Sequence, residues 1–228
     1  MYIVRICIEE ALYISTSTKK LIWPIDTEPM LSILKHPRLT ILFALRFKPL
    51  SYFIKVGIIG SFASSLIGFI GAKLALTVPL GDVIYSSFIT SILMYFVSIA
   101  LLSGIAYVIG AAFNGKGKFR ALFRAMSLTV IPYIWILPII LFWMQLSPLT
   151  FFTINFDGAT WIDVAFSISG GLAIIAATIW TLILTVQAVS IVHQFSKWKS
   201  AATCFFMLLI VVGIFSFVQS ALFGFLTV

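Results

Sequence analysis

The chain has 228 residues, of which 61% are hydrophobic and only 10% are charged, and its mean hydropathy is +1.15. So few charged residues cannot cover the surface of a soluble domain, and the composition therefore predicts an integral membrane protein. The formal net charge of +8 does not indicate a nucleic-acid-binding protein, because the 15 Lys and Arg are concentrated in short segments between apolar runs.

Residues 1–55 contain many of these charged residues, and we expect them to form an amino-terminal cytoplasmic or interfacial segment. No window in this segment is long and apolar enough to span a bilayer. Residues 38–55 mix basic and apolar side chains. This mixture fits a helix that lies at the membrane surface with its lysines reaching toward head groups, and it also fits an irregular linker packed on the helix bundle.

Residues 56–228 contain five apolar runs of the length that crosses a bilayer, which takes about 20 helical residues. The sequence therefore predicts an all-α fold, a polytopic membrane helix bundle with five transmembrane helices. The predicted spans are residues 56–76, 83–113, 127–146, 164–192 and 201–226. The third span contains Pro132 and Pro138, which we expect to kink it, because proline removes a helical hydrogen bond.

The basic residues predict the orientation of these spans. All but one of the 15 Lys and Arg lie in the amino-terminal segment and in the connectors at residues 114–126 and 194–200, the exception being Lys73. Five spans place these three segments on one side of the membrane, which the positive-inside rule assigns to the cytoplasm. We therefore expect a cytoplasmic amino terminus, a carboxyl terminus outside, and contact of the basic face with anionic lipids.

Residues that could carry chemistry are scarce. The predicted spans contain almost no ionisable side chains, which intramembrane catalysis and proton-coupled transport require. The two histidines, His36 and His193, are expected at the inner face, whereas Asp157 and Asp163 are expected at the outer face. Cys7 and Cys204 show no metal-ligand spacing. The sequence therefore predicts no catalytic residue, no metal site, no cofactor and no enzymatic activity.

Residues 110–117 match the pattern G-x-x-x-x-G-K of a phosphate-binding loop, but Gly117 stands where such a loop has Ser or Thr. The segment also follows a predicted membrane helix instead of a strand. We interpret it as a glycine-terminated helix followed by a basic cytoplasmic loop.

A stripe of small residues recurs every fourth position in the first span, at Gly60, Ser64 and Gly68. Small side chains allow two helices in lipid to approach closely. We expect this stripe to pack against another helix of the same chain. The alternative is a contact between two copies in a homo-oligomer.

Two segments carry a resemblance to a known family. The first contains Ile109-Gly110, Asn114-Gly115-Lys116-Gly117-Lys118-Phe119-Arg120-Ala121-Leu122-Phe123-Arg124 and Val130-Ile131-Pro132-Tyr133. The second runs from Trp180 to Val192 and through His193-Gln194-Phe195-Ser196-Lys197-Trp198-Lys199-Ser200-Ala201. Over about residues 30–228, the chain resembles the Yip1 domain family.

The resemblance implies a five-span protein with a cytoplasmic amino terminus and, for the eukaryotic members, a role in membrane trafficking through protein contacts. The chain lacks the Asp-Leu-Tyr-Gly-Pro segment of the eukaryotic branch. We therefore expect a prokaryotic member that resides in the cytoplasmic (inner) membrane.

These observations predict a non-enzymatic membrane protein that scaffolds or organises membrane partners. Its expected partners are anionic membrane lipids and either an unknown protein or a second copy of the chain, with no nucleic acid. The expected cytoplasmic contact loop comprises Gly115, Lys116, Gly117, Lys118, Phe119, Arg120 and Arg124. The alternative function is a transporter or channel for a small or lipophilic solute.

Overall fold

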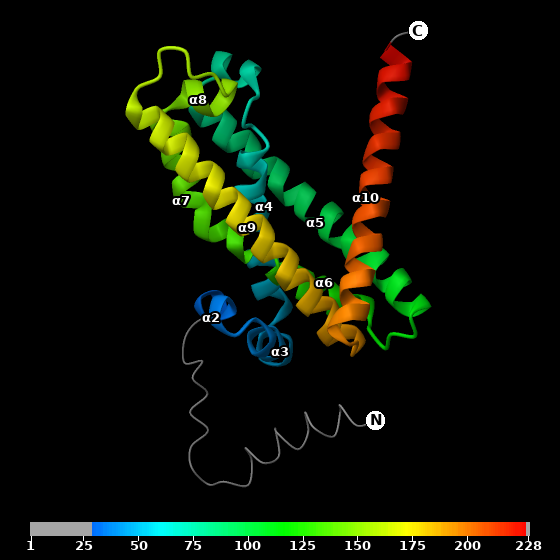
Figure 1. Ribbon diagram of the computed structural model, residues 1–228. Coiled ribbons are helices and arrows are strands. Elements are labelled where there is room, and N and C mark those ends of the chain that lie inside the picture. Colours follow the sequence, from blue (N-terminus) through cyan, green and yellow to red (C-terminus); the bar gives the residue numbers. More distant parts are fainter. Residues whose placement is uncertain (1–28, 227–228) are drawn as a thin grey trace, which may run out of the picture.

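The computed structural model describes residues 29–226, and within this range the chain is helical and contains no strand (Figure 1). Among these described residues, five segments are long and apolar enough to cross a membrane, so the predicted five-span helix bundle is confirmed. The spanning segments are α4 (Leu50–Ile67), α5 (Leu80–Ala112), α6 and α7 together (Phe119–Leu146), α9 (Trp161–His193) and α10 (Lys197–Leu226). Residues 1–28 of the predicted amino-terminal segment lie outside the described residues.

Two short helices precede the first span, namely α2 (Pro29–Lys35) and α3 (Pro37–Phe47). The side chains of Ile33, Ile41 and Ala44 are fully buried in a core that α4, α6 and α9 complete. On the opposite face of α3, Leu39 and Leu42 are exposed beside basic residues. This part of the segment is therefore helical and packs on one end of the bundle, with Leu39 and Leu42 exposed on the other face of α3.

The first spanning helix begins and ends earlier than the predicted range of 56–76. It starts directly after Pro49, and Lys55, which the sequence placed at the domain boundary, is an exposed residue in its second turn. Beyond Ile67 the chain leaves the helix, and Gly71 has a positive φ of 80°. The Gly71 N–H donates to the carbonyl oxygen of Phe151 at 3.0 Å, which holds this turn against the opposite connector.

The third spanning segment is divided into α6 (Phe119–Leu128) and α7 (Ile131–Leu146) instead of being one kinked helix from residue 127. Pro132 cannot donate a hydrogen bond to Leu128, and its ring would clash with that carbonyl group. The chain turns at Thr129 and Val130 and then starts a new helix with Pro132 in its first turn. Pro138 lies inside α7, which continues through it.

The connector before α9 is folded and contains the short helix α8 (Pro148–Thr153). The Trp143 indole N–H donates to the hydroxyl oxygen of Thr150 at 3.1 Å, and Phe151 and Phe152 are buried beside it. The Asp163 side chain closes a capping box with Thr160 at the start of α9 and also accepts a hydrogen bond from the Ser147 hydroxyl. This end of the bundle is therefore closed by packed structure.

In the assembled bundle α4 lies between α5 and α7, and α7 packs along α9. The last helix, α10, contacts α9 and α5 through its first half, where Thr203, Cys204 and Met207 are buried. Its second half leans away from the other helices (Figure 1), and Val212 and Phe217 are exposed. The helices α5, α9 and α10 begin a few residues before their predicted spans, since helices can continue beyond the hydrocarbon layer.

Candidate functional site

The charged side chains divide the bundle into two ends. Every described Lys and Arg except Lys73 lies at the end formed by α2, α3, α6, the loop after α5 and the start of α10 (Figure 1). The three described acidic residues, Asp82, Asp157 and Asp163, lie at the opposite end. We call the first of these ends the basic end. None of the described carboxylates lies at this end.

The loop of the basic end starts where α5 terminates. Asn114 adopts the left-handed conformation with φ of 63°, and the Gly115 N–H donates to the carbonyl oxygen of Gly110 at 2.8 Å. This bond across a left-handed residue is that of a Schellman motif, which satisfies a carbonyl group left open at the helix end. The chain therefore reverses sharply after α5.

The end of α9 repeats the same geometry. Gln194 is left-handed with φ of 58°, and the Phe195 N–H donates to the carbonyl oxygen of Ser190 at 3.0 Å. The Ser190 hydroxyl returns a hydrogen bond to the carbonyl oxygen of Phe195 at 2.9 Å. The two helix ends carry the two motifs by which the sequence resembles a known family.

His193 joins these two helix ends. Its side chain is only 1% exposed, and its ring stacks on Phe195 with centroids 5.2 Å apart. The Gly117 N–H donates to His193 Nδ1 at 3.3 Å. A Cβ atom added to Gly110, Gly115 or Gly117 would overlap the His193 ring. We call Gly110, Gly115, Gly117, His193 and Phe195 together the His193 cradle. Its three positions facing the ring require glycine because the His193 ring occupies the space that any other side chain would need.

The cradle determines the shape of the contact loop that the sequence predicted. The Lys116 N–H approaches the carbonyl oxygen of His193 at 3.4 Å, which adds a second backbone link between the loop and α9. The side chains of Lys116, Lys118, Phe119 and Arg120 are exposed. The loop therefore exposes three cations on a backbone that hydrogen bonds to His193 hold in place.

Arg124, the last residue of the predicted contact loop, has different surroundings. Its guanidinium group donates to the carbonyl oxygen of Lys48 at 2.5 Å and lies 4.5 Å from the ring centroid of Phe53. The side chain is half-buried. It therefore holds α6 against the junction of α3 and α4, through a charge-assisted hydrogen bond and a cation–π contact.

The predicted stripe of small residues on α4 is buried at one of its three positions. A Cβ atom on Gly60 would overlap Val130, so this glycine permits close approach at the turn between α6 and α7. Ser64 and Gly68 are exposed. Gly57, one turn earlier, is buried against the ring of Tyr95.

Tyr95 forms the centre of a polar contact that the sequence analysis did not identify. It is fully buried on α5, and its hydroxyl group shares a 2.9 Å hydrogen bond with the Ser127 hydroxyl. The carbonyl oxygen of Phe53, at 3.4 Å, is a second and more distant acceptor for the Tyr95 hydroxyl group. A signal exists in the sequence, since Tyr95 continues a four-residue repeat on α5 with Ser87 and Ser91, both buried.

The described residues contain no group of three or more His, Cys, Asp and Glu side chains that could hold a metal ion. His36 is exposed on the amino-terminal side, and His193 is enclosed in its cradle. The arrangement brings cations, backbone amides and aromatic rings together at the basic end. These groups are suited to binding anions and surfaces.

Comparison with known proteins agrees with the motifs at the two helix ends. Residues 31–219 match the sequence profile of the Yip1 domain, and this range includes α3 to α9 and most of α10. The comparisons with curated proteins and with solved structures gave no match.

Proposed function

Since this chain belongs to the Yip1 domain family and has five apolar segments long enough to cross a membrane, we propose that it scaffolds or organises membrane partners without enzymatic chemistry. The observation that carries this proposal is the fixed basic loop. Lys116, Lys118 and Arg120 are exposed on a backbone held by the His193 cradle, with no described acidic residue at the same end. A preorganised charged surface binds a partner with a smaller loss of conformational entropy than a flexible one does.

The proposed partners are anionic membrane lipids and a protein, which is either a different chain or a second copy of this one. Exposed cations near a membrane attract an anionic surface by about 1 kcal/mol per residue. The face of α3 that exposes Leu39, Leu42 and Arg46 extends this surface. No cofactor and no nucleic acid are part of the proposal.

The contact surface is tested by the triple variant Lys116→Ala, Lys118→Ala, Arg120→Ala in the full-length protein. We expect reproducible loss of the protein that co-purifies with the wild type in nanodiscs, because the variant removes the exposed charges and leaves the cradle glycines in place. Arg124 is retained because its contacts are within the fold. Mass spectrometry of the purified complexes measures the result.

The matched control is Lys73→Ala, which removes a cation from the opposite end of the bundle. It should leave the recovered partner unchanged. Equal partner recovery from the triple variant and the wild type would contradict the proposed surface. Uptake of a solute by proteoliposomes that contain the purified protein alone would support the alternative, a transporter or channel.

We further propose that the basic end faces the cytoplasm of a prokaryotic cell, with the protein in the inner membrane. The positive-inside rule supports this orientation. In a variant with Cys7 and Cys204 replaced by Ala, Asp157→Cys should react with an impermeant maleimide in intact cells. Lys197→Cys, which is also exposed, should react only after the membrane is opened. The reverse labelling pattern would contradict the orientation.

A further inference from the structure

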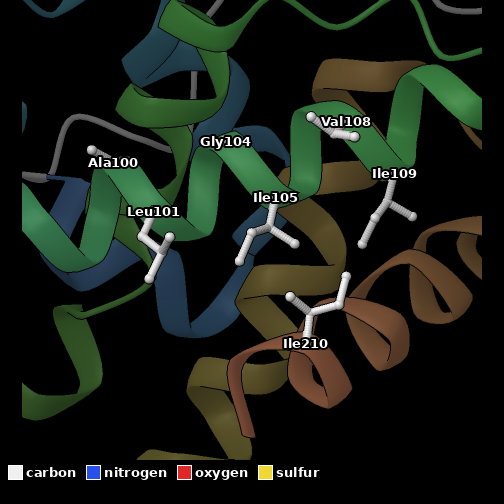
Figure 2. Close-up of a pocket in the computed structure, with 7 residues that line it drawn as sticks. All are labelled: Ala100, Leu101, Gly104, Ile105, Val108, Ile109 and Ile210. Atoms are coloured by element: carbon white, nitrogen blue, oxygen red, sulfur yellow. The ribbon is translucent and has the colours of Figure 1, made fainter. Parts of the chain in front are cut away.

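An apolar groove lies between α5 and α10. The two helices approach each other near the basic end and separate beyond this contact (Figure 1). Figure 2 shows Leu101, Ile105 and Ile109 pointing from α5 toward Ile210 of α10. The groove has a volume of about 380 Å³ and an almost entirely apolar lining. We call it the α5–α10 groove and define it by Ala100, Leu101, Gly104, Ile105, Ile109 and Ile210.

The apolar lining of the groove suits a hydrocarbon chain. The α5 side of the groove extends from Ala100 to Ile109, which is roughly 14 Å of helix. A lipid acyl chain is much narrower than a protein helix and can follow the taper between two diverging helices.

Gly104 contributes to the space within the groove. A Cβ atom at this position would meet no atom within 4 Å, so the glycine is not required by close packing within the chain. Gly110, six residues later on the same helix, differs from it because the His193 ring occupies the space where a Cβ atom would lie. A larger side chain at position 104 can therefore fill the groove without displacing a neighbouring helix.

The charge at one end of the groove complements a lipid phosphate. The Phe113 and Phe206 rings, with centroids 6.4 Å apart, join α5 and α10 between the groove and the basic end. Lys116 and Lys118 follow α5, and Lys197 and Lys199 lie in the first turn of α10. All four lysines are exposed. The groove therefore runs into the bilayer from the end of the bundle at which the segments flanking it carry exposed lysines, which matches the layout of an anionic lipid.

We propose that the α5–α10 groove holds one acyl chain of an anionic phospholipid, and that the lysines at its basic end bind the phosphate of the same molecule. The lipid belongs to the leaflet on the side of the basic end. The apolar part of the site, formed by α5 and α10, is separate from the exposed loop surface proposed for a protein partner, whereas Lys116 and Lys118 belong to both. Occupancy by lipid would fill the space between the diverging helices.

The variant Gly104→Leu tests the apolar part of the site. Native mass spectrometry of the full-length protein in mild detergent, titrated with a phosphatidylglycerol, gives the dissociation constant of the first bound lipid. We expect Gly104→Leu to weaken this first binding about tenfold or more, because its side chain occupies the space of several methylene groups. Ile210→Phe fills the groove from the α10 side and should weaken binding in the same direction.

The control is Gly171→Leu on α9, where an added Cβ atom also meets no atom within 4 Å. It should bind the first lipid as the wild type does. Circular dichroism and gel filtration verify that each variant is folded. Equal affinity of Gly104→Leu, Ile210→Phe and the wild type would overturn the proposal. A dimer that these two variants abolish, with unchanged lipid binding, would also overturn it and would identify a second copy as the occupant.

The charged part is tested with the double variant Lys116→Ala, Lys118→Ala. The wild type should bind phosphatidylglycerol more tightly than phosphatidylcholine, and the double variant should reduce this preference at least about threefold. Glycerophosphate, which lacks acyl chains, should not compete. An unchanged headgroup preference, or competition by glycerophosphate alone, would overturn the proposal. Because Gly104→Leu leaves all lysines in place, its result is independent of whether the loop recruits a protein.

Discussion

Replacing Tyr95 by Ala is expected to destabilise the protein by about 3–5 kcal/mol, the range seen when a buried aromatic side chain is removed. The ring, on α5, is fully buried against α4 and α6 and lies directly against Gly57. The loss should come mainly from packing, because association of helices in lipid depends on van der Waals contact more than on the hydrophobic effect. Unfolding in mixed micelles with increasing SDS would measure the change.

Two further variants separate packing from hydrogen bonding at this position. Tyr95→Phe keeps the ring and removes the hydroxyl group, so its cost should be about 1 kcal/mol. The Ser127 hydroxyl keeps its hydrogen bond to the carbonyl oxygen of Phe123 in this variant. Tyr85→Ala on the same helix, where the side chain is 68% exposed, is the control and should have little effect. Equal destabilisation by Tyr95→Ala and Tyr85→Ala would contradict the structure.

Replacing Gly110 by Ala is expected to destabilise the protein by about 1–3 kcal/mol, because overpacking forces an enclosed neighbour to move. The added Cβ atom would overlap the His193 ring, which is held by Phe195 on one face and by Gly117 at Nδ1. Gly104→Ala on the same helix is the control. Its Cβ atom meets nothing within 4 Å, so this variant should be neutral or slightly stabilising.

A double-mutant cycle tests the contact itself. His193→Ala removes the ring and leaves space for a Cβ atom at position 110, so Gly110→Ala should cost less in the His193→Ala background than in the wild type. We expect a coupling of at least about 0.5 kcal/mol, the lower bound for residues in direct contact. Strictly additive effects of the two substitutions would show that the cradle does not form as described.

The His193 cradle also connects the stability of the fold to its proposed function. The Gly115 and Gly117 backbones that enclose His193 are the same backbones that carry Lys116 and Lys118 to the surface. Destabilising the cradle should therefore loosen the loop, because its left-handed turn and its link to α9 are formed together. The glycines and His193 position the loop, whereas the exposed cations are its proposed contact groups.

Local sequence was sufficient for the coarse features of the protein. The helical membrane fold, its number of spans and its family were predicted and are confirmed, since hydropathy over about 20 residues and the motifs after α5 and α9 depend on local sequence alone. The boundaries were less accurate. The first spanning helix includes Lys55, which the prediction placed before the span, because a lysine near a helix end can reach the membrane interface. Most of α6 falls in the predicted connector at residues 114–126, because Arg120 and Arg124 make this stretch look like a basic loop.

The sequence by itself determined that the chain crosses a membrane and that its described cations, apart from Lys73, gather at one end of the bundle. Only the tertiary structure decided which face of each span is buried, because residues facing lipid and residues facing a neighbouring helix are equally apolar. Gly104 and Gly110 are both glycines within apolar stretches of α5. Gly104 lines the α5–α10 groove, whereas Gly110 packs against the His193 ring of α9. Arg124 likewise differs from Arg120 only through the carbonyl group and ring that α3 and α4 bring to it.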